Sequence, residues 1–234
     1  MTTINLDTGF PETALQFLAD LRENNTREWF EQNRDRYEND LMDTAVALLE
    51  TVGTRLQSHF PNVRYDTARN GSGSLMRIYR DTRFSKDKTP YKDRIAMGFP
   101  LGEGKKMQVP SFGLQITPED CGLIAGILGF SKDQLKQYRE AVVDDTHGHA
   151  LLHAIDTVTQ QGDYSISGTH YKRPPRGFEM PNDERDPYLL HNGLWVSMPA
   201  IARAQVTQPN FVDTVVSHFV AMYPVVAWLE EVLR

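Results

Sequence analysis

The chain has 234 residues, of which 40% are hydrophobic and 24% are charged, and its formal net charge is −6. This length suits one large α+β domain, and the composition is that of a globular protein and excludes a disordered chain. The negative charge disfavours nonspecific binding to nucleic acid or to an anionic membrane surface, although a local basic patch can override it.

Cysteine usage and the N-terminal residues predict the compartment. Cys121 is the only cysteine, so no disulfide can form within the chain and a reducing interior is the expected environment. The opening MTTINLDTGF lacks the basic start and apolar core of a signal peptide, and the longest nearly unbroken apolar run, GLIAGILGF, is too short to span a membrane. We therefore expect a soluble cytoplasmic protein without membrane contact.

The first sixty residues predict two helices. Leucines at helical spacing indicate a short helix over 11–25, and a long helix is expected from Asn25 to a point before Pro61. Asn25 with Glu28 three residues later is a variant of the capping box at its start. An apolar stripe along the long helix should be buried against the sheet; it consists of Phe30, Tyr37, Leu41, Leu48, Val52 and Leu56.

After residue 73, short segments separated by Gly and Pro predict strands of an antiparallel sheet. These segments are SLMRIYR (74–80), DRIAMGF (93–99), SFGLQI (111–116) and CGLIAGIL (121–128). Phe112, Leu114 and Ile116 alternate with polar or small residues, which predicts one buried face. Cys121, alone in an apolar strand, is expected in the core.

The remaining elements complete an α+β pattern. They are a helix over 131–145 capped by Ser131, a helix over 148–161, a surface loop over 171–187, a strand over 193–201, and a terminal helix over 209–234 that is kinked or divided at Pro224. We predict a single domain over residues 1–234. Its fold should be an antiparallel sheet of about five or six strands with helices packed on one face and an edge.

The stretch RIYRDTRFSKDKTPYK, residues 77–92, concentrates charge in an otherwise acidic chain. From 77 to 94, seven basic residues oppose three acidic ones, a local charge of +4; they are Arg77, Arg80, Arg83, Lys86, Lys88, Lys92 and Arg94, against Asp81, Asp87 and Asp93. We expect a long hairpin loop with its two strand shoulders. Alternation along the first shoulder should place Arg77 and Tyr79 on one face with Leu75, and Arg80 on the other.

This stretch, with FLADLRENNTREWFEQNRDRY before it and YKRPPRGF after it, resembles a bacterial and fungal family known only as domain of unknown function 2461. The hallmark of that family is Arg-x-x-Arg-Asp-x-Arg-Phe, then Asp or Asn with Lys, then Tyr. The matching residues are Arg77, Arg80, Asp81, Arg83, Phe84, Asp87, Lys88 and Tyr91. The resemblance implies no established activity, cofactor or catalytic residue.

Two interpretations of the hairpin stand side by side. In the first it is an anion-binding site, because the planar fork of arginine holds a phosphate or carboxylate at two points; the candidate residues are Arg77, Arg80, Asp81, Arg83, Lys88 and Tyr91. In the second, Asp81 and Asp87 brace a long loop in a structural ion-pair network. The later Pro-rich loop with Lys172, Arg173 and Arg176 either closes over the same site or is solvated.

The leading functional hypothesis is a cytosolic protein that binds an anionic small molecule or a phosphorylated ligand through this hairpin. The alternative is a noncatalytic interaction module that docks on an acidic protein surface, and nucleic-acid binding is disfavoured by the overall charge.

No catalytic residue, cofactor or metal site is predicted. His149 and His153 have a metal-binding spacing but lack the intervening Glu of a metalloprotease. Asn33, at the edge of the apolar stripe, is expected to hydrogen-bond to a neighbouring loop in preference to a ligand.

Overall fold

The structure is a computed structural model that describes residues 6, 8–104, 108–173, 177–178 and 181–233. Over these residues the chain forms helices and one open antiparallel sheet of six strands, so the predicted α+β class is confirmed. The strand order is β1-β2-β3-β5-β4, and β6 pairs with β3. The strands are β1 (Ile95–Pro100), β2 (Ser111–Ile116), β3 (Asp120–Ile127), β4 (Ser165–Thr169), β5 (His191–Ser197) and β6 (Ile201–Ala202).

The chain divides into two compact units of three segments each. Unit 1 comprises Met1–Phe99, Gly113–Gly122 and Ala200–Ser217, and unit 2 comprises Pro100–Phe112, Leu123–Pro199 and His218–Arg234. Because the segments alternate along the sequence, the chain passes between the units five times. The single domain stays a prediction.

Strand burial follows the sequence pattern. Phe112, Leu114 and Ile116 on β2 are at most 2% exposed, as their alternation predicts. Buried and partly exposed residues also alternate along all eight residues of β3. Cys121 on this strand is fully buried, so its predicted place in the core is confirmed.

Strand β4 has no counterpart among the predicted elements. Its sequence, SISGT, holds one large apolar residue and therefore lacks the pattern of a strand. It pairs with β5, and the register shifts between Ser167 and Thr169. Gly168 at the shift has φ +135°, and a Cβ there would lie 2.0 Å from the carbonyl oxygen of Gly193. Only glycine fits at this bulge.

Unit 1 begins with α1 (Glu12–Glu23), as predicted, but the long helix after it is interrupted. In its place lie α2 (Arg27–Gln32), α3 (Arg34–Arg36), the π-helix η1 (Tyr37–Met42) and α4 (Asp43–His59), which ends before Pro61 as predicted. The first break is at Asn33, whose backbone (φ −111°, ψ 18°) is not helical. The predicted cap is wrong by one residue, because Thr26 accepts the hydrogen bond from the backbone N–H of Trp29.

The predicted apolar stripe is buried despite the interruption. Its six side chains have relative exposures between 0% and 9%. Phe30 packs on the rings of Tyr37 and Tyr91, with centroids 4.9 Å and 4.1 Å away. The stripe therefore anchors the helical segments of this unit.

Unit 2 contains α5 (Lys132–Val143), α6 (Asp145–Thr159) and the 3₁₀ helix η2 (Asp186–Leu190). Ser131 caps α5 in a full capping box with Gln134, so the predicted cap is confirmed. Helix α6 begins three residues earlier than predicted, because Asp144 accepts a hydrogen bond from the backbone N–H of His147.

The chain ends with α7 (Arg203–Val206) and α8 (Phe211–Val232). Helix α8 runs through Pro224 as one element, so a division there is wrong. Within the described part of the chain, α8 is the one helix with the length and composition to cross a membrane. Half of its most apolar window is buried in the fold, and core helices satisfy the same criterion.

Candidate functional site

The shoulders of the basic hairpin form an irregular ladder. Single-residue bridges join Leu75 to Met97 and Tyr79 to Tyr91, so the regular strand predicted over 74–80 is wrong. Between the bridges, three residues (76–78) face five (92–96). This mismatch interrupts the pairing and places Arg77 opposite the segment that contains Lys92 and Arg94.

The mismatch also changes which side chains face inward. Leu75 and Ile78 are at most 2% exposed, whereas Arg77 and Tyr79 face solvent. The predicted alternation, with Arg77 on the face of Leu75, is therefore wrong. Side chains alternate between the two faces of a strand only where its pairing with the neighbouring strand is regular.

Aromatic packing fixes the second shoulder. Tyr91 is 3% exposed, and its ring stacks on Phe30 with the planes 15° apart. Asn25, the predicted helix cap, instead holds the backbone of Tyr91: its Nδ2 donates to the carbonyl and its Oδ1 accepts from the N–H, both at 3.1 Å. Burial raises the pKa of Tyr91 above its usual value. Tyr91 therefore packs the second shoulder of the hairpin against the helical segments of unit 1.

The loop over 81–90 is braced by its own polar groups. Arg80 Nη1 donates to Asp87 Oδ2 and to Thr89 Oγ1, each at 2.5 Å. Hydrogen bonds from the N–H and hydroxyl of Thr89, together with Arg80, lower the pKa of Asp87 to about 2. Arg83 binds both carboxylate oxygens of Asp81 and lowers the pKa of that carboxyl.

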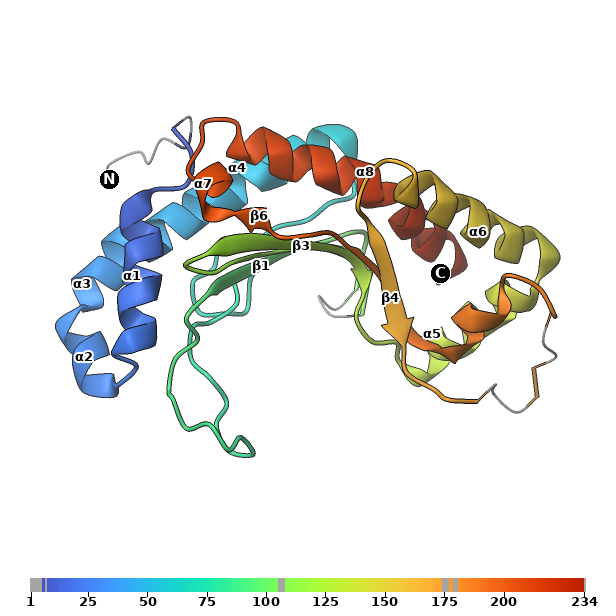
Figure 1. The fold of residues 1–234 in the computed structure, drawn as a ribbon, viewed down its shortest axis with the longest axis horizontal. Helices are drawn as coiled ribbons and strands as arrows, with labels where there is room; N and C mark the ends of the chain where they lie inside the picture. Colours follow the sequence, from blue (N-terminus) through green and yellow to red (C-terminus); the bar gives the residue numbers. More distant parts are fainter. Residues whose placement is uncertain (1–5, 7, 105–107, 174–176, 179–180, 234) are drawn as a thin grey trace. The chain divides into compact units, whose positions relative to one another are not determined.

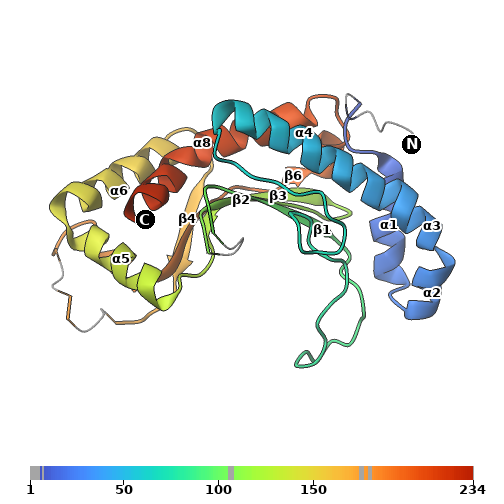
Figure 2. The same ribbon diagram turned by 180° about the vertical axis from the view of Figure 1, so that it is seen from behind.

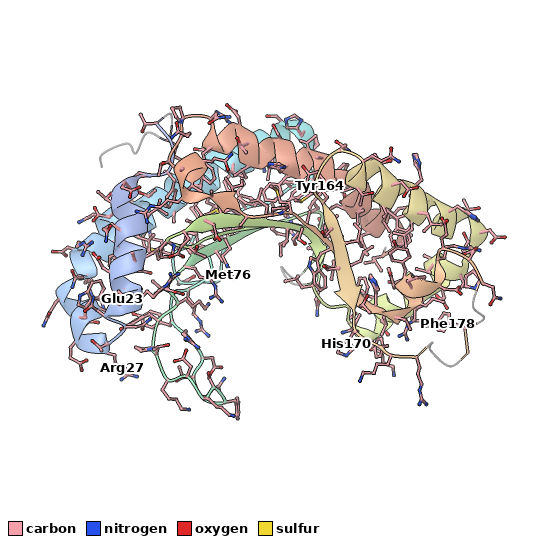
Figure 3. All side chains as sticks on the ribbon, viewed as in Figure 1. Glu23, Arg27, Met76, Tyr164, His170 and Phe178 are labelled. Carbon is pink, nitrogen blue, oxygen red and sulfur yellow. The ribbon has the colours of Figure 1, made fainter. Side chains whose placement is uncertain are left out.

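The six predicted site residues therefore lie in three environments. Arg80, Asp81 and Arg83 form ion pairs within the loop, and Lys88 Nζ donates to the carbonyl oxygen of Thr82 at 2.8 Å. Tyr91 lies in the aromatic core, and Arg77 lies at the base, exposed. In Figure 3, Met76 marks this base, and the side chains of the loop extend beyond it.

The carboxylates of the hairpin are all engaged. Asp81 pairs with Arg83, Asp87 with Arg80, and Asp93 with Arg22 of α1 at 2.5 Å. Within the described residues, five hairpin cations have no carboxylate oxygen within 4.0 Å; they are Arg77, Lys86, Lys88, Lys92 and Arg94. The local positive charge is therefore only partly neutralised.

Lys92 is the most confined of these cations. It is half-buried, and its Nζ donates to the carbonyl oxygen of Arg77 at 2.9 Å. Burial, together with the positive charges of Arg94 and Arg77, lowers the pKa of Lys92 below its usual value. Arg77, Lys92 and Arg94 form a group that we call the basal cluster. Lys92 and Arg94 contribute to the local charge read from the sequence but are not among the six predicted site residues, because only the irregular ladder brings them opposite Arg77.

Asn33 makes its hydrogen bonds to residues of the two helices that flank it, α2 and α3. Its Nδ2 donates to the carbonyl of Trp29 at 2.9 Å, and its Oδ1 accepts from Arg36 at 3.2 Å. The expected bond to a neighbouring loop is therefore wrong. These bonds satisfy the polar side chain at the point where the helix breaks.

Two other sequence candidates are the histidine pair and the later basic loop. His149 and His153 are exposed on α6, and the described residues contain no group of three side chains able to hold a metal ion. In the loop over 171–187, Lys172 and Arg173 are exposed, and Arg176 lies outside the described residues.

Comparison with known sequences supplies the family. A search of curated proteins finds no match to this sequence. The family described as "Conserved hypothetical protein (DUF2461)" matches residues 13–228, nearly the whole chain. The chain therefore belongs to this family, as the motif in the basic hairpin predicts.

Proposed function

We propose that this protein binds an anionic small molecule or a phosphorylated ligand at the basal cluster of its hairpin. The observation that carries the proposal is that Lys92, half-buried, lies beside two arginines and has no carboxylate within 4.0 Å among the described residues. Like charges gathered in this way repel one another, and a bound anion relieves the repulsion.

The scaffold beneath the cluster supports the proposal. The backbone N–H of Lys92 donates to the carbonyl oxygen of Ile78 at 2.8 Å. The neighbouring Tyr91 is hydrogen-bonded by Asn25 and stacks on the ring of Phe30. A ligand would therefore meet a lysine whose backbone is already positioned. Binding then costs less ordering of the protein.

The two arginines add the chemistry that recognises oxyanions. A guanidinium donates two parallel hydrogen bonds to a phosphate or carboxylate, and an ammonium adds a compact charge. Arg77 and Arg94 are exposed, so their side chains are accessible to a ligand from solvent. The ion pairs of Arg80 and Arg83 support a bracing role for these residues instead.

The proposal is tested by thermal melting at low ionic strength with inorganic phosphate or pyrophosphate, and with potassium chloride at matched ionic strength. A ligand at about 100 times its Kd stabilises the folded state by about 2.7 kcal/mol. We expect the melting temperature of the wild type to rise with phosphate and not with chloride.

The matched variants are Lys92→Met and Lys132→Met, since Lys132 is an exposed lysine on α5. Lys92→Met should melt at or above the wild-type temperature without ligand and gain nothing from phosphate. Lys132→Met should behave as the wild type. An equal gain in all three proteins would refute the proposal, as would no gain in the wild type.

A further inference from the structure

The tip of the hairpin, residues 80–90, displays a phenylalanine in solvent. Phe84 is 95% exposed, whereas the other large hydrophobic residues exposed within the described part of the chain, Leu128, Tyr79 and Val220, lie between 38% and 51%. The guanidinium of Arg83 lies over the ring, with its Cζ 5.9 Å from the ring centroid. Burying an aromatic ring is one of the largest favourable contributions to folding and binding, and at 95% exposure this ring obtains very little of it from the described residues.

The tip that carries Phe84 is nevertheless ordered by polar contacts. Arg80 joins Asp87 and Thr89, and Lys88 closes back onto the carbonyl of Thr82. The backbone N–H of Ser85, next to Phe84, donates to the same carbonyl at 3.4 Å. A loop braced in this way loses little conformational freedom when a partner binds it. Figures 1 and 2 show this loop extending away from β1.

Basic residues flank Phe84 in the sequence of the tip. Residues 80–90 contain four basic residues and two acidic ones, a net charge of +2, while the rest of the chain carries −8 (−6 minus +2). Lys86 and Lys88 have no carboxylate within 4.0 Å among the described residues. A partner surface that matches this tip is apolar at its centre and acidic around it.

We infer that the hairpin tip is a docking element that inserts Phe84 into an apolar pocket with an acidic rim on a partner protein. Aromatic anchors of this kind dominate the affinity of protein interfaces when a pocket excludes water from them. The features at the tip favour a protein over an anionic bilayer. One ring with a net charge of +2 is a weaker anchor than a single myristoyl chain, which by itself binds membranes only marginally.

The partner is first captured by photocrosslinking. A benzophenone amino acid replaces Phe84 in the full-length chain, or Leu128 as the control, and each protein is irradiated in an extract of cells that naturally make it. We expect a protein of acidic pI to be captured from position 84 and not from position 128. Equal capture at the two positions, or none at position 84, would overturn the inference.

Direct binding of the captured partner, purified, then decides the role of the ring. Phe84→Ala should weaken binding by about 30-fold or more, and Leu128→Ala should leave it unchanged. The double variant Lys86→Glu/Lys88→Glu should slow association and reduce its dependence on salt. Binding of Phe84→Ala within threefold of the wild type would contradict the inference.

Two further measurements separate the alternatives. Vesicles with 30% phosphatidylserine should not retain the protein. If they retain the wild type and not Phe84→Ala, the tip binds a membrane and not a partner protein. Phe84→Ala should keep the stabilisation by phosphate proposed for the basal cluster, so the two proposals fail independently.

Discussion

The stacked pair Phe30–Tyr91 joins the helical segments of unit 1 to the base of the hairpin, and its energy can be measured. Phe30 is fully buried and Tyr91 is 3% exposed, with ring centroids 4.1 Å apart. Each single replacement, Phe30→Leu or Tyr91→Leu, should destabilise the protein by about 1–3 kcal/mol through lost packing. An aromatic pair contributes about 0.5–1.5 kcal/mol beyond the burial of its area.

A double-mutant cycle isolates this pair. Because the second replacement cannot remove a stack already lost, the double variant should be destabilised by about 0.5–1.5 kcal/mol less than the sum of the singles. Urea unfolding followed by circular dichroism at 222 nm and by tryptophan fluorescence gives the free energies, provided that the two transitions coincide. As a control, Phe30→Leu should add to Tyr138→Leu within about 0.5 kcal/mol, since the ring of Tyr138 contacts Phe130 and Trp228 instead. Additivity of Phe30 and Tyr91 within about 0.3 kcal/mol would refute the assigned stack.

Three further predictions concern charge. Arg185→Met should lower the free energy of unfolding in urea titrations, because its side chain is 6% exposed and binds Asp183 through two nitrogens; an unchanged free energy of unfolding contradicts this. Burial lowers the folded-state pKa of His191 and His218 below 6.5, so the unfolded chain binds these protons more readily. The melting temperature should therefore fall as the pH drops through about 6.5 and level off below the folded-state pKa. If the melting temperature of a His218→Gln variant depends on pH as strongly as that of the wild type, His218 does not contribute to this dependence. Finally, Arg80→Ala should lower the melting temperature more than Arg83→Ala, because the Arg80 side chain is 30% exposed and that of Arg83 is 77% exposed; the reverse order would contradict the bracing role.

The sequence predicts elements well where one pattern acts alone. The alternation on β2 and the cap at Ser131 depend on neighbouring residues, and both are found as expected. Strand β4 is not predictable in this way, because its backbone pairing with β5 and the close approach of Gly168 to Gly193 come from the tertiary fold.

The candidate site illustrates the same limit. The charge of the hairpin and its family motif can be read from the chain, but the division into braced and uncompensated cations cannot. It depends on Asp93 pairing with Arg22, far away in the sequence, and on the mismatch that sets Arg77 opposite Lys92. Asn25 is likewise a residue type that commonly caps helices, and only the fold shows that its side chain hydrogen-bonds the backbone of Tyr91.

The titration of Lys92 tests the central claim, anion binding at the basal cluster, most directly. The lysines are dimethylated with ¹³C, which keeps their charge, and the methyl resonances are followed by NMR against pH with and without pyrophosphate; Lys92→Arg assigns the signal. The proposal predicts that the pKa of Lys92 lies below its usual value without ligand and rises with pyrophosphate, whereas the methyl resonance of Lys132 does not move when pyrophosphate is added. A Lys92 resonance that titrates with the other lysines and does not respond to pyrophosphate would contradict it.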